Sequence, residues 1–198
     1  MVYFQIRDYA SVLLYRAFGA FFGRMGKRAR IVWPLRIVGA GYCNFGDEAV
    51  LQYGAYVAVL PVHNDTPRLS VGPRTQIGNH AHIVVTHSVE IGASVLIADR
   101  FFVADNAHEF ADPEVPIRDQ GLRKLAPVSI GDGSWIGENV CVVGASIGRQ
   151  CVVGANSVVT RDLPDHCVAA GSPAIVLKRY CAARQQWRRT NPAGDFVE

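Results

Sequence analysis

The sequence lacks paired cysteines. Its five cysteines are odd in number, scattered along the chain and free of any C-x-x-C pair: Cys43, Cys141, Cys151, Cys167 and Cys181. Disulfide frameworks and structural zinc sites need paired or closely spaced cysteines, so neither is expected here. We interpret the five as small hydrophobic residues, packed in or near the core of a protein of the reducing cytoplasm.

Long apolar runs and a strong net charge are also missing. No apolar stretch reaches the ~20 residues of a membrane-spanning helix, and the N-terminal residues do not follow the pattern of a signal peptide. Charged residues are 19% of the 198, and the net charge of +3 comes from an excess at the two ends. A uniformly basic face for nucleic acid is therefore not expected, and the 49% hydrophobic content argues against disorder.

The sequence does contain a six-residue repeat. Between residues 130 and 161 an aliphatic residue, usually followed by glycine, returns every six residues with one interval of five: Ile130, Ile136, Val142, Ile147, Val153 and Val159. A helix face would repeat at three to four residues and a surface strand at two. The six-residue period predicts a parallel β-helix with three short sides to each coil. Each side contributes one inward aliphatic residue, and the small residue after it lets the chain turn the corner.

This repeat predicts one domain with two interruptions. Coils are expected over residues 31–173. A loop with two prolines separates coils at residues 60–69, and a longer projecting loop with three prolines and mixed charges occupies residues 108–128. Long insertions in repeat proteins usually collect on the functional face, so the longer loop marks the expected site.

Both ends of the chain are predicted to be helical. Residues 4–25 show the pattern of an amphipathic helix, and a basic cluster follows within the N-terminal unit, residues 1–30. This unit either covers the open end of the β-helix, which we favour, or lies on an anionic membrane surface as a peripheral contact. At the other end, residues 174–198 are predicted to form a basic helix, from Ile175 to about Arg189, and a loose tail.

Several segments together resemble the hexapeptide-repeat acyltransferases. These segments are Asp105-Asn106-Ala107-His108 before the long loop, Ser134-Trp135-Ile136-Gly137 after it, residues 153–162 and Ala170-Gly171-Ser172-Pro173-Ala174. The resemblance covers roughly residues 71–179. It is to the galactoside and maltose O-acetyltransferase branch, and is closest to the O-acetyltransferases of lipopolysaccharide O-antigen and capsule synthesis. It implies an all-β fold, a left-handed parallel β-helix, a homotrimer, and acetyl-coenzyme A as donor, with the active site between subunits.

His108 matches the position of the family's catalytic histidine. Moving an acetyl group from a thioester to a sugar hydroxyl needs a base for the hydroxyl proton, and an imidazole suits this task near neutral pH. The thioester is already activated, so direct transfer without a covalent intermediate is expected. A solitary histidine at the start of a loop is otherwise an ordinary surface residue.

Three neighbours of His108 are candidate substrate-binding residues. Asp105 and Asn106 either contact the acceptor sugar or the imidazole, or stabilise the turn that begins the loop, as Asx residues often do. His82 lies one coil earlier, at the same position of its hexapeptide as His108. It either contacts substrate across a subunit boundary or bonds to backbone at a corner. The other histidines, His63, His80, His87 and His166, are expected to be structural.

The resemblance also implies a coenzyme site. Trp135 matches the residue that lines the acyl end of the coenzyme, unless it is an ordinary packed aromatic on the outside of a coil. Ala155 and Thr160 match positions that contact the pantetheine arm and the adenine end, while Arg161 and Lys178 match basic positions near the phosphates. The sequence departs from the family pattern at one position, where Ile175 stands in place of a second arginine. Arg179 or Arg184 could supply that positive charge instead. For Arg184, Arg188 and Arg189 a solvated helix face is expected.

The expected activity is acetyl-coenzyme A-dependent O-acetylation of a sugar hydroxyl in surface-polysaccharide synthesis, with no metal. Two alternatives remain open: an N-acetyltransferase of a nucleotide-linked amino sugar, and a non-catalytic β-helix scaffold. The zinc-dependent carbonic anhydrases built on this β-helix need three histidines around the metal, and the spacing of His80, His82, His87 and His108 does not match that family's cluster.

Overall fold

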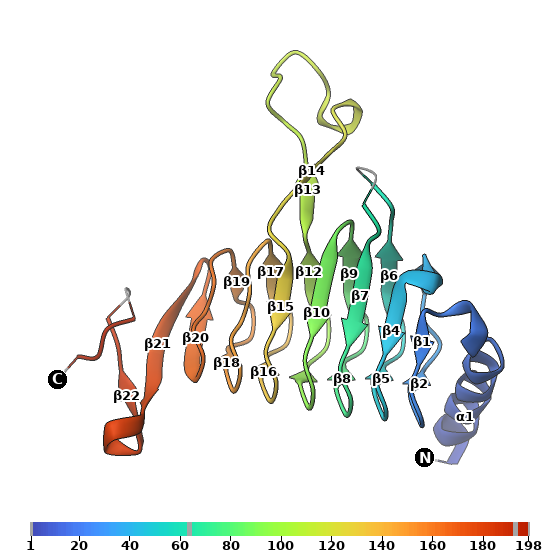
Figure 1. Cartoon of the computed structure of the whole chain (residues 1–198), viewed down its shortest axis with the longest axis horizontal. Helices are drawn as coiled ribbons and strands as arrows, with labels where there is room; N and C mark the ends of the chain where they lie inside the picture. The colour runs from blue at the N-terminus through green and yellow to red at the C-terminus, as the bar shows by residue number, and fades with distance from the viewer. Residues whose placement is uncertain (1, 63–64, 192–193, 198) are drawn as a thin grey trace.

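The chain folds as a three-sided parallel β-helix, flanked by a helix at its N-terminal end and a strand hairpin at its C-terminal end (Figure 1). The computed structural model describes residues 2–62, 65–191 and 194–197. His63 lies outside the described residues.

Three sheets form the three faces of the β-helix, and the strands of the coils run parallel within each face. The first face contains β1 (Arg24–Met25), β4 (Cys43–Phe45), β7 (Arg68–Val71), β10 (Ser88–Ile91) and β15 (Val128–Ile130). The parallel part of the second face contains β2 (Arg30–Ile31), β5 (Val50–Leu51), β8 (Gln76–Ile77), β11 (Leu96–Ile97), β16 (Trp135–Ile136), β18 (Val152–Val153) and β20 (Cys167–Gly171). The third face contains β3 (Arg36–Val38), β6 (Tyr56–Val59), β9 (His82–Val85), β12 (Phe102–Ala104), β17 (Cys141–Val143) and β19 (Val158–Val159).

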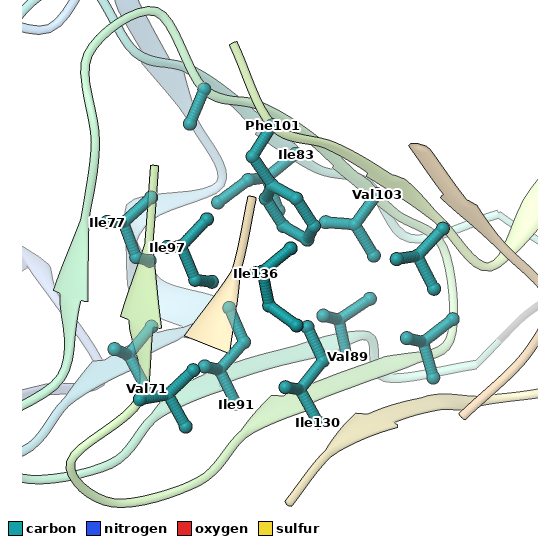
Figure 2. Packing of buried hydrophobic residues seen from close by; sticks show 14 of the residues in the cluster. Val71, Ile77, Ile83, Val89, Ile91, Ile97, Phe101, Val103, Ile130 and Ile136 are labelled. Carbon is teal, nitrogen blue, oxygen red and sulfur yellow. The ribbon is translucent and has the colours of Figure 1, made fainter. Parts of the chain in front are cut away.

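The predicted aliphatic repeat forms the core. Ile130 and Ile136 are at most 1% exposed, and Ile97 lies directly beside Ile136 in the neighbouring strand. Figure 2 shows how such residues from successive coils stack inside the β-helix. Adjacent strands of a sheet are about 4.8 Å apart, so each aliphatic side chain contacts its counterparts above and below. One contiguous hydrophobic column therefore holds the coils together.

Close stacking also explains the glycine that follows many of these aliphatic residues. At Gly72, an added Cβ would lie 2.5 Å from the carbonyl carbon of Gly92, in the same position of the next coil. The corners contain residues with positive φ as well, such as Glu48, Arg74 and Ser94 at the corner between the first and second faces. The predicted corner role of the small residues is confirmed at Gly72.

The β-helix begins earlier than predicted. Helix α1 (Val2–Ala17) ends eight residues before Met25, and a short 3-10 turn, η1 (Gly19–Phe21), leads into β1. The first coil therefore starts at Arg24, not at Ile31. Arg24 and Met25 pair in register with Asn44 and Phe45 of β4, which draws the start of the expected basic segment into the sheet. Helix α1 packs on this first coil, since the buried Ser11 hydroxyl donates to the Ile31 carbonyl at 3.0 Å.

The predicted C-terminal helix is wrong. Residues 174–189 form β21 (Ala174–Cys181), the 3-10 turn η4 (Ala182–Arg184) and β22 (Gln186–Arg189). Strand β21 pairs antiparallel with β20 and extends the second face past the last coil. If β20 were the final strand, its outer edge would leave backbone N–H and C=O groups unpaired. The hairpin of β21 and β22 prevents this, because β21 pairs with that edge. Among the described residues, no helix is long and apolar enough to cross a bilayer.

The projecting segment also contains strands. It leaves the corner between the third and first faces as β13 (Asn106–His108) and returns as β14 (Leu122–Lys124), with the 3-10 turn η3 (Ile117–Asp119) near its tip. A further 3-10 turn, η2 (Ala40–Tyr42), precedes β4. The hairpin extends away from the coils on the same side as the connection between β6 and β7 (Figure 1).

Candidate functional site

His108 lies at the end of a strand that projects from a corner of the β-helix. Strands β13 and β14 are antiparallel, and His108 is opposite Leu122. The pairing continues beyond them, since the Glu109 amide donates to the Gly121 carbonyl at 3.0 Å. The His108 side chain is exposed. A regular strand pair thus presents an imidazole to solvent beside the coils, where it could accept a proton from an incoming hydroxyl group.

Asp105 anchors this hairpin to the preceding coil. Its side chain is 0% exposed, and its carboxylate accepts hydrogen bonds from the backbone amides of Thr86, His87 and Ser88 at 2.7–2.8 Å. The Thr86 hydroxyl at 3.2 Å and the Asn106 amide nitrogen at 3.1 Å also donate to it. These donors occupy both carboxylate oxygens, so the geometry gives Asp105 a positioning role for the strand that ends in His108.

Asn106 is also turned toward the coils. It is 8% exposed, and its side-chain amide lies 3.4 Å from the Val84 carbonyl in addition to its bond to Asp105. In this conformation both Asp105 and Asn106 bond within the corner from which the hairpin leaves. Only His108, two residues further along, has an exposed side chain.

A second group of contacts braces the hairpin from the side. The Lys124 ammonium lies 2.6 Å from a carboxylate oxygen of Asp65, in the connection between β6 and β7. The same oxygen lies 3.5 Å from Nδ1 of His87. Because Lys124 is directly opposite Asn106 in the strand pair, this ion pair ties the two projecting segments together beside the candidate base.

His82 is on the outside of the third face. It lies between two aromatic rings of neighbouring coils, with ring centroids 4.7 Å from Tyr56 and 5.4 Å from Phe102, both edge-on. These three residues belong to one outward row, which continues to Cys141 and Val158. The row begins at Arg36 and is otherwise mostly aromatic or apolar. It crosses each strand at its first residue, whereas the His108 hairpin leaves from the opposite end of β12.

The second face has a different outward row. Five residues stand side by side on successive strands: Leu96, Trp135, Val152, Val168 and Lys178. Trp135 is 52% exposed, and Lys178 is exposed three strands away, or about 14 Å at ordinary strand spacing. Arg189 of β22 is directly opposite Lys178 and extends the row by another cation. The row is therefore apolar from Leu96 to Val168 and cationic at Lys178 and Arg189; in the other direction it continues to Gln76, Val50 and Arg30.

This row fits the chemistry of coenzyme A. An apolar strip suits the pantetheine arm, and two adjacent cations suit phosphate groups. The sequence predicts Trp135 and Lys178 as coenzyme residues, whereas it predicts Arg189 on a solvated helix face and gives it no place in this row. The residues 182–185 between the two strands, Ala-Ala-Arg-Gln, favour helix and contain no typical turn residue, so the sequence offers no signal for this register.

The other predicted coenzyme residues lie at corners. Ala155 is exposed between the second and third faces, while Thr160 and Arg161 are exposed after the last strand of the third face. Arg179, considered as a substitute for the missing arginine, is half-buried and packs against the C-terminal residues, with Cζ 6.0 Å from the Phe196 ring centre. Arg184 is in η4, at the far tip of the terminal hairpin.

The predicted site residues therefore form two groups within one chain. His108 and His82 are associated with the third face, and Trp135 and Lys178 with the second. Ala155 lies at the corner between these two faces. In a triangular coil the outer surfaces of two faces point in different directions, so one chain alone does not bring His108 and Trp135 to a common cleft.

The other described histidines have local partners. His80 occupies a corner at a φ of +56° and contacts the Tyr53 ring edge-on, and His166 lies near Tyr180. Among the described residues, no three histidine, cysteine, aspartate or glutamate side chains gather closely enough to hold a metal ion.

Comparisons with known proteins agree with this architecture. Residues 127–161 match the hexapeptide repeat of succinyl-transferase. The chain is 32% identical over 193 residues to the putative lipopolysaccharide biosynthesis O-acetyl transferase WbbJ of Escherichia coli, covering 93% of this chain and 92% of that one. It is 42% identical over 136 residues to a probable acetyltransferase of Mycobacterium tuberculosis, covering 66% of this chain and 44% of the relative, so it spans less than half the length of that protein.

Solved structures share the fold. A galactoside acetyltransferase in complex with coenzyme A is 30% identical, with a TM-score of 0.52 over 73% of this chain and 70% of the other. AntD, an N-acyltransferase from Bacillus cereus, is 18% identical with a TM-score of 0.70 over 84% of this chain and 87% of the other, a likeness of fold alone. Because the likeness to the E. coli protein spans nearly the whole of both chains, this protein belongs to the hexapeptide-repeat acetyltransferase family.

Proposed function

We propose that the protein transfers an acetyl group from acetyl-coenzyme A to a sugar hydroxyl in the synthesis of a surface polysaccharide. The observation that carries this proposal is the outward row of the second face, because it offers an apolar strip next to paired cations for the donor. The full-length likeness to a putative lipopolysaccharide O-acetyl transferase supports a sugar acceptor. The five free cysteines lead us to expect a reducing compartment, the cytoplasm. A thioester donor such as acetyl-coenzyme A suits that compartment.

In the proposed reaction His108 is the general base. Its imidazole takes the proton of the sugar hydroxyl as the oxygen attacks the thioester carbonyl. The tetrahedral intermediate then collapses, the carbon–sulfur bond breaks, and the leaving thiolate takes a proton from the imidazolium. The products are an acetyl ester and free coenzyme A. In this scheme a backbone amide polarises the thioester carbonyl. A general base such as the His108 imidazole typically raises the rate by a factor of about 10²–10⁴.

The two separated groups of residues require a second copy of the chain. In a homotrimer of left-handed β-helices, the third face of one protomer meets the second face of its neighbour. The apolar outward row with Tyr56 and Phe102 suits such a contact. His108 of one protomer then lies at the mouth of a cleft whose other wall contains the Trp135-to-Lys178 row of the next. Ala155, Thr160 and Arg161 lie near the coenzyme in this arrangement, and His82 faces the cleft.

A thiol-release assay with acetyl-coenzyme A and a panel of sugars tests this proposal. His108→Asn should lower kcat by at least about 10²-fold while leaving the unfolding midpoint unchanged. His80→Asn is the matched control, because His80 is an exposed histidine in a left-handed conformation that asparagine adopts readily. Wild-type rates from His108→Asn would remove the assigned base, and no thiol release with any acceptor would favour the non-catalytic scaffold.

The same panel separates O-acetylation from N-acetylation. A nucleotide-linked amino sugar is included because AntD, an N-acyltransferase, shares the fold. Turnover of the amino sugar alone, with an amide product resistant to mild base, would replace the proposed ester chemistry.

A further inference from the structure

Helix α1 has one face fixed against the β-helix. The Ser11 hydroxyl is 0% exposed, donates to the Ile31 carbonyl at 3.0 Å and accepts from the Trp33 amide at 2.7 Å. Further along, the Tyr15 ring contacts Phe22, and Phe22 in turn contacts Phe45 of the second coil. Helix α1 thus covers the open end of the first coil with its inner face, as the sequence favoured.

This end of the molecule also exposes large apolar side chains. Within the residues whose side chains are described, the exposed members are Tyr9 at 70%, Leu13 at 66%, Leu14 at 43%, Phe18 at 49%, Phe21 at 68% and Leu35 at 76%. We call this set the N-terminal apolar patch. Helical spacing places Tyr9 beside Leu13, and Leu14 beside Phe18. Monomeric soluble proteins rarely expose so many large apolar side chains together, and such patches mark interaction surfaces.

The same end of the chain is strongly basic. Seven of the 20 lysine and arginine residues, and only one of the 17 acidic residues, lie within the first 36 positions. Arg24 and Arg28 face Asp47 and Glu48, whereas Arg16, Lys27 and Arg30 are exposed nearby. The partner of the patch must therefore accept both apolar side chains and a surrounding excess of positive charge.

We propose that the N-terminal apolar patch docks on an anionic lipid surface. An amphipathic helix that buries its apolar side chains at the headgroup boundary, with arginine and lysine at its margin, is the usual form of such a contact. A second copy of this end fits less well, because the same excess of positive charge would face itself. Helix α1 lies at the N-terminal end of the coil stack, next to β1 and β2 (Figure 1). This inference is independent of the acetyl-transfer proposal.

Co-sedimentation with lipid vesicles tests the proposal. The full chain should pellet with vesicles of mixed phosphatidylcholine and phosphatidylglycerol, pellet much less with phosphatidylcholine alone, and be released by high salt. Leu13→Glu with Phe21→Glu should weaken binding to anionic vesicles at least about tenfold, because the acids replace exposed apolar anchors. The matched control is Val115→Glu with Ile117→Glu, two exposed apolar residues on the projecting loop, which should bind like the wild type.

A second variant tests the electrostatic part separately. Arg16→Gln with Lys27→Gln leaves the apolar patch intact and should reduce the preference for anionic over neutral vesicles severalfold. The proposal is overturned if the wild-type protein does not pellet with anionic vesicles, or if the acidic variants of patch and loop bind equally well. It is also overturned if Leu13→Glu with Phe21→Glu changes the mass of the protein assembly in solution but leaves vesicle binding unchanged. The patch would then be a contact between copies of the chain.

Discussion

The replacement Asp105→Ala distinguishes an anchoring role from a substrate contact. In the structure the carboxylate is completely buried and accepts three backbone amides, from Thr86, His87 and Ser88. Alanine removes every acceptor at once. The amide of Thr86, a residue 1% exposed, is then left without a partner, whereas His87 and Ser88 are half-buried and can bond to water.

The expected loss of stability follows from these contacts. One buried amide left without a partner costs about 1–3 kcal/mol, and the lost bonds to a charged acceptor add to it, so we expect about 3 kcal/mol in total. For a chain of this size that corresponds to a fall of about 9 °C in Tm. Urea unfolding at one fixed protein concentration measures the free energy, because association would otherwise shift the midpoint.

Asp132→Ala is the matched control. Asp132 is also an aspartate at a corner, but its carboxylate oxygen accepts one exposed amide, from Ala93 at 2.7 Å. Its loss should cost about 1 kcal/mol. If Asp105→Ala unfolds at the wild-type urea concentration yet loses acetyl transfer, the anchoring argument is refuted, and Asp105 acts on the acceptor instead.

Two further predictions concern the coils. An added Cβ at Gly78 would lie 2.5 Å from the Ala98 carbonyl carbon, so Gly78→Ala should lower the free energy of unfolding in urea by about 2 kcal/mol or more. At Gly41 the nearest atom to an added Cβ is 3.8 Å away, so Gly41→Ala should change it by less than about 0.5 kcal/mol. Equal losses in the two variants would contradict the packing argument. Burial raises the pKa of the Cys43 thiol to about 12, so very little of it is thiolate near pH 9. Mass spectrometry after iodoacetamide treatment near pH 9 should find Cys43 alkylated only in denatured protein, and rapid labelling of the native chain would show that the site is open.

The sequence was sufficient to predict most of the β-helix because its signal is repeated. Each inward isoleucine or valine occupies the same environment in every coil, so an error at one position is corrected by the next. The ends carry no such repetition. Residues 174–189 contain good helix formers and no marked turn residue, and only the unpaired edge of β20 decides that they form strands.

The candidate site could be predicted in part for the same reason. The motif around His108 predicts the base, but whether Asp105 faces a sugar or the backbone depends on the corner of the preceding coil, 17–19 residues away. The pairing of Lys178 with Arg189 depends on a hairpin register that short-range patterns do not specify. The contact of Asp65 with Lys124 joins two loops 59 residues apart, and no spacing rule predicts it.

The central claim is that His108 and Trp135 act on opposite sides of a cleft between protomers. Its most direct measurement is subunit complementation, with His108→Ala and Trp135→Ala chains co-expressed under different affinity tags and mixed trimers purified through both tags. Each variant alone should be nearly inactive. A mixed trimer contains one intact pairing of His108 with Trp135 among its three interfaces, so about one third of the wild-type rate should return. Mixed trimers no more active than either variant alone would contradict a site shared between protomers.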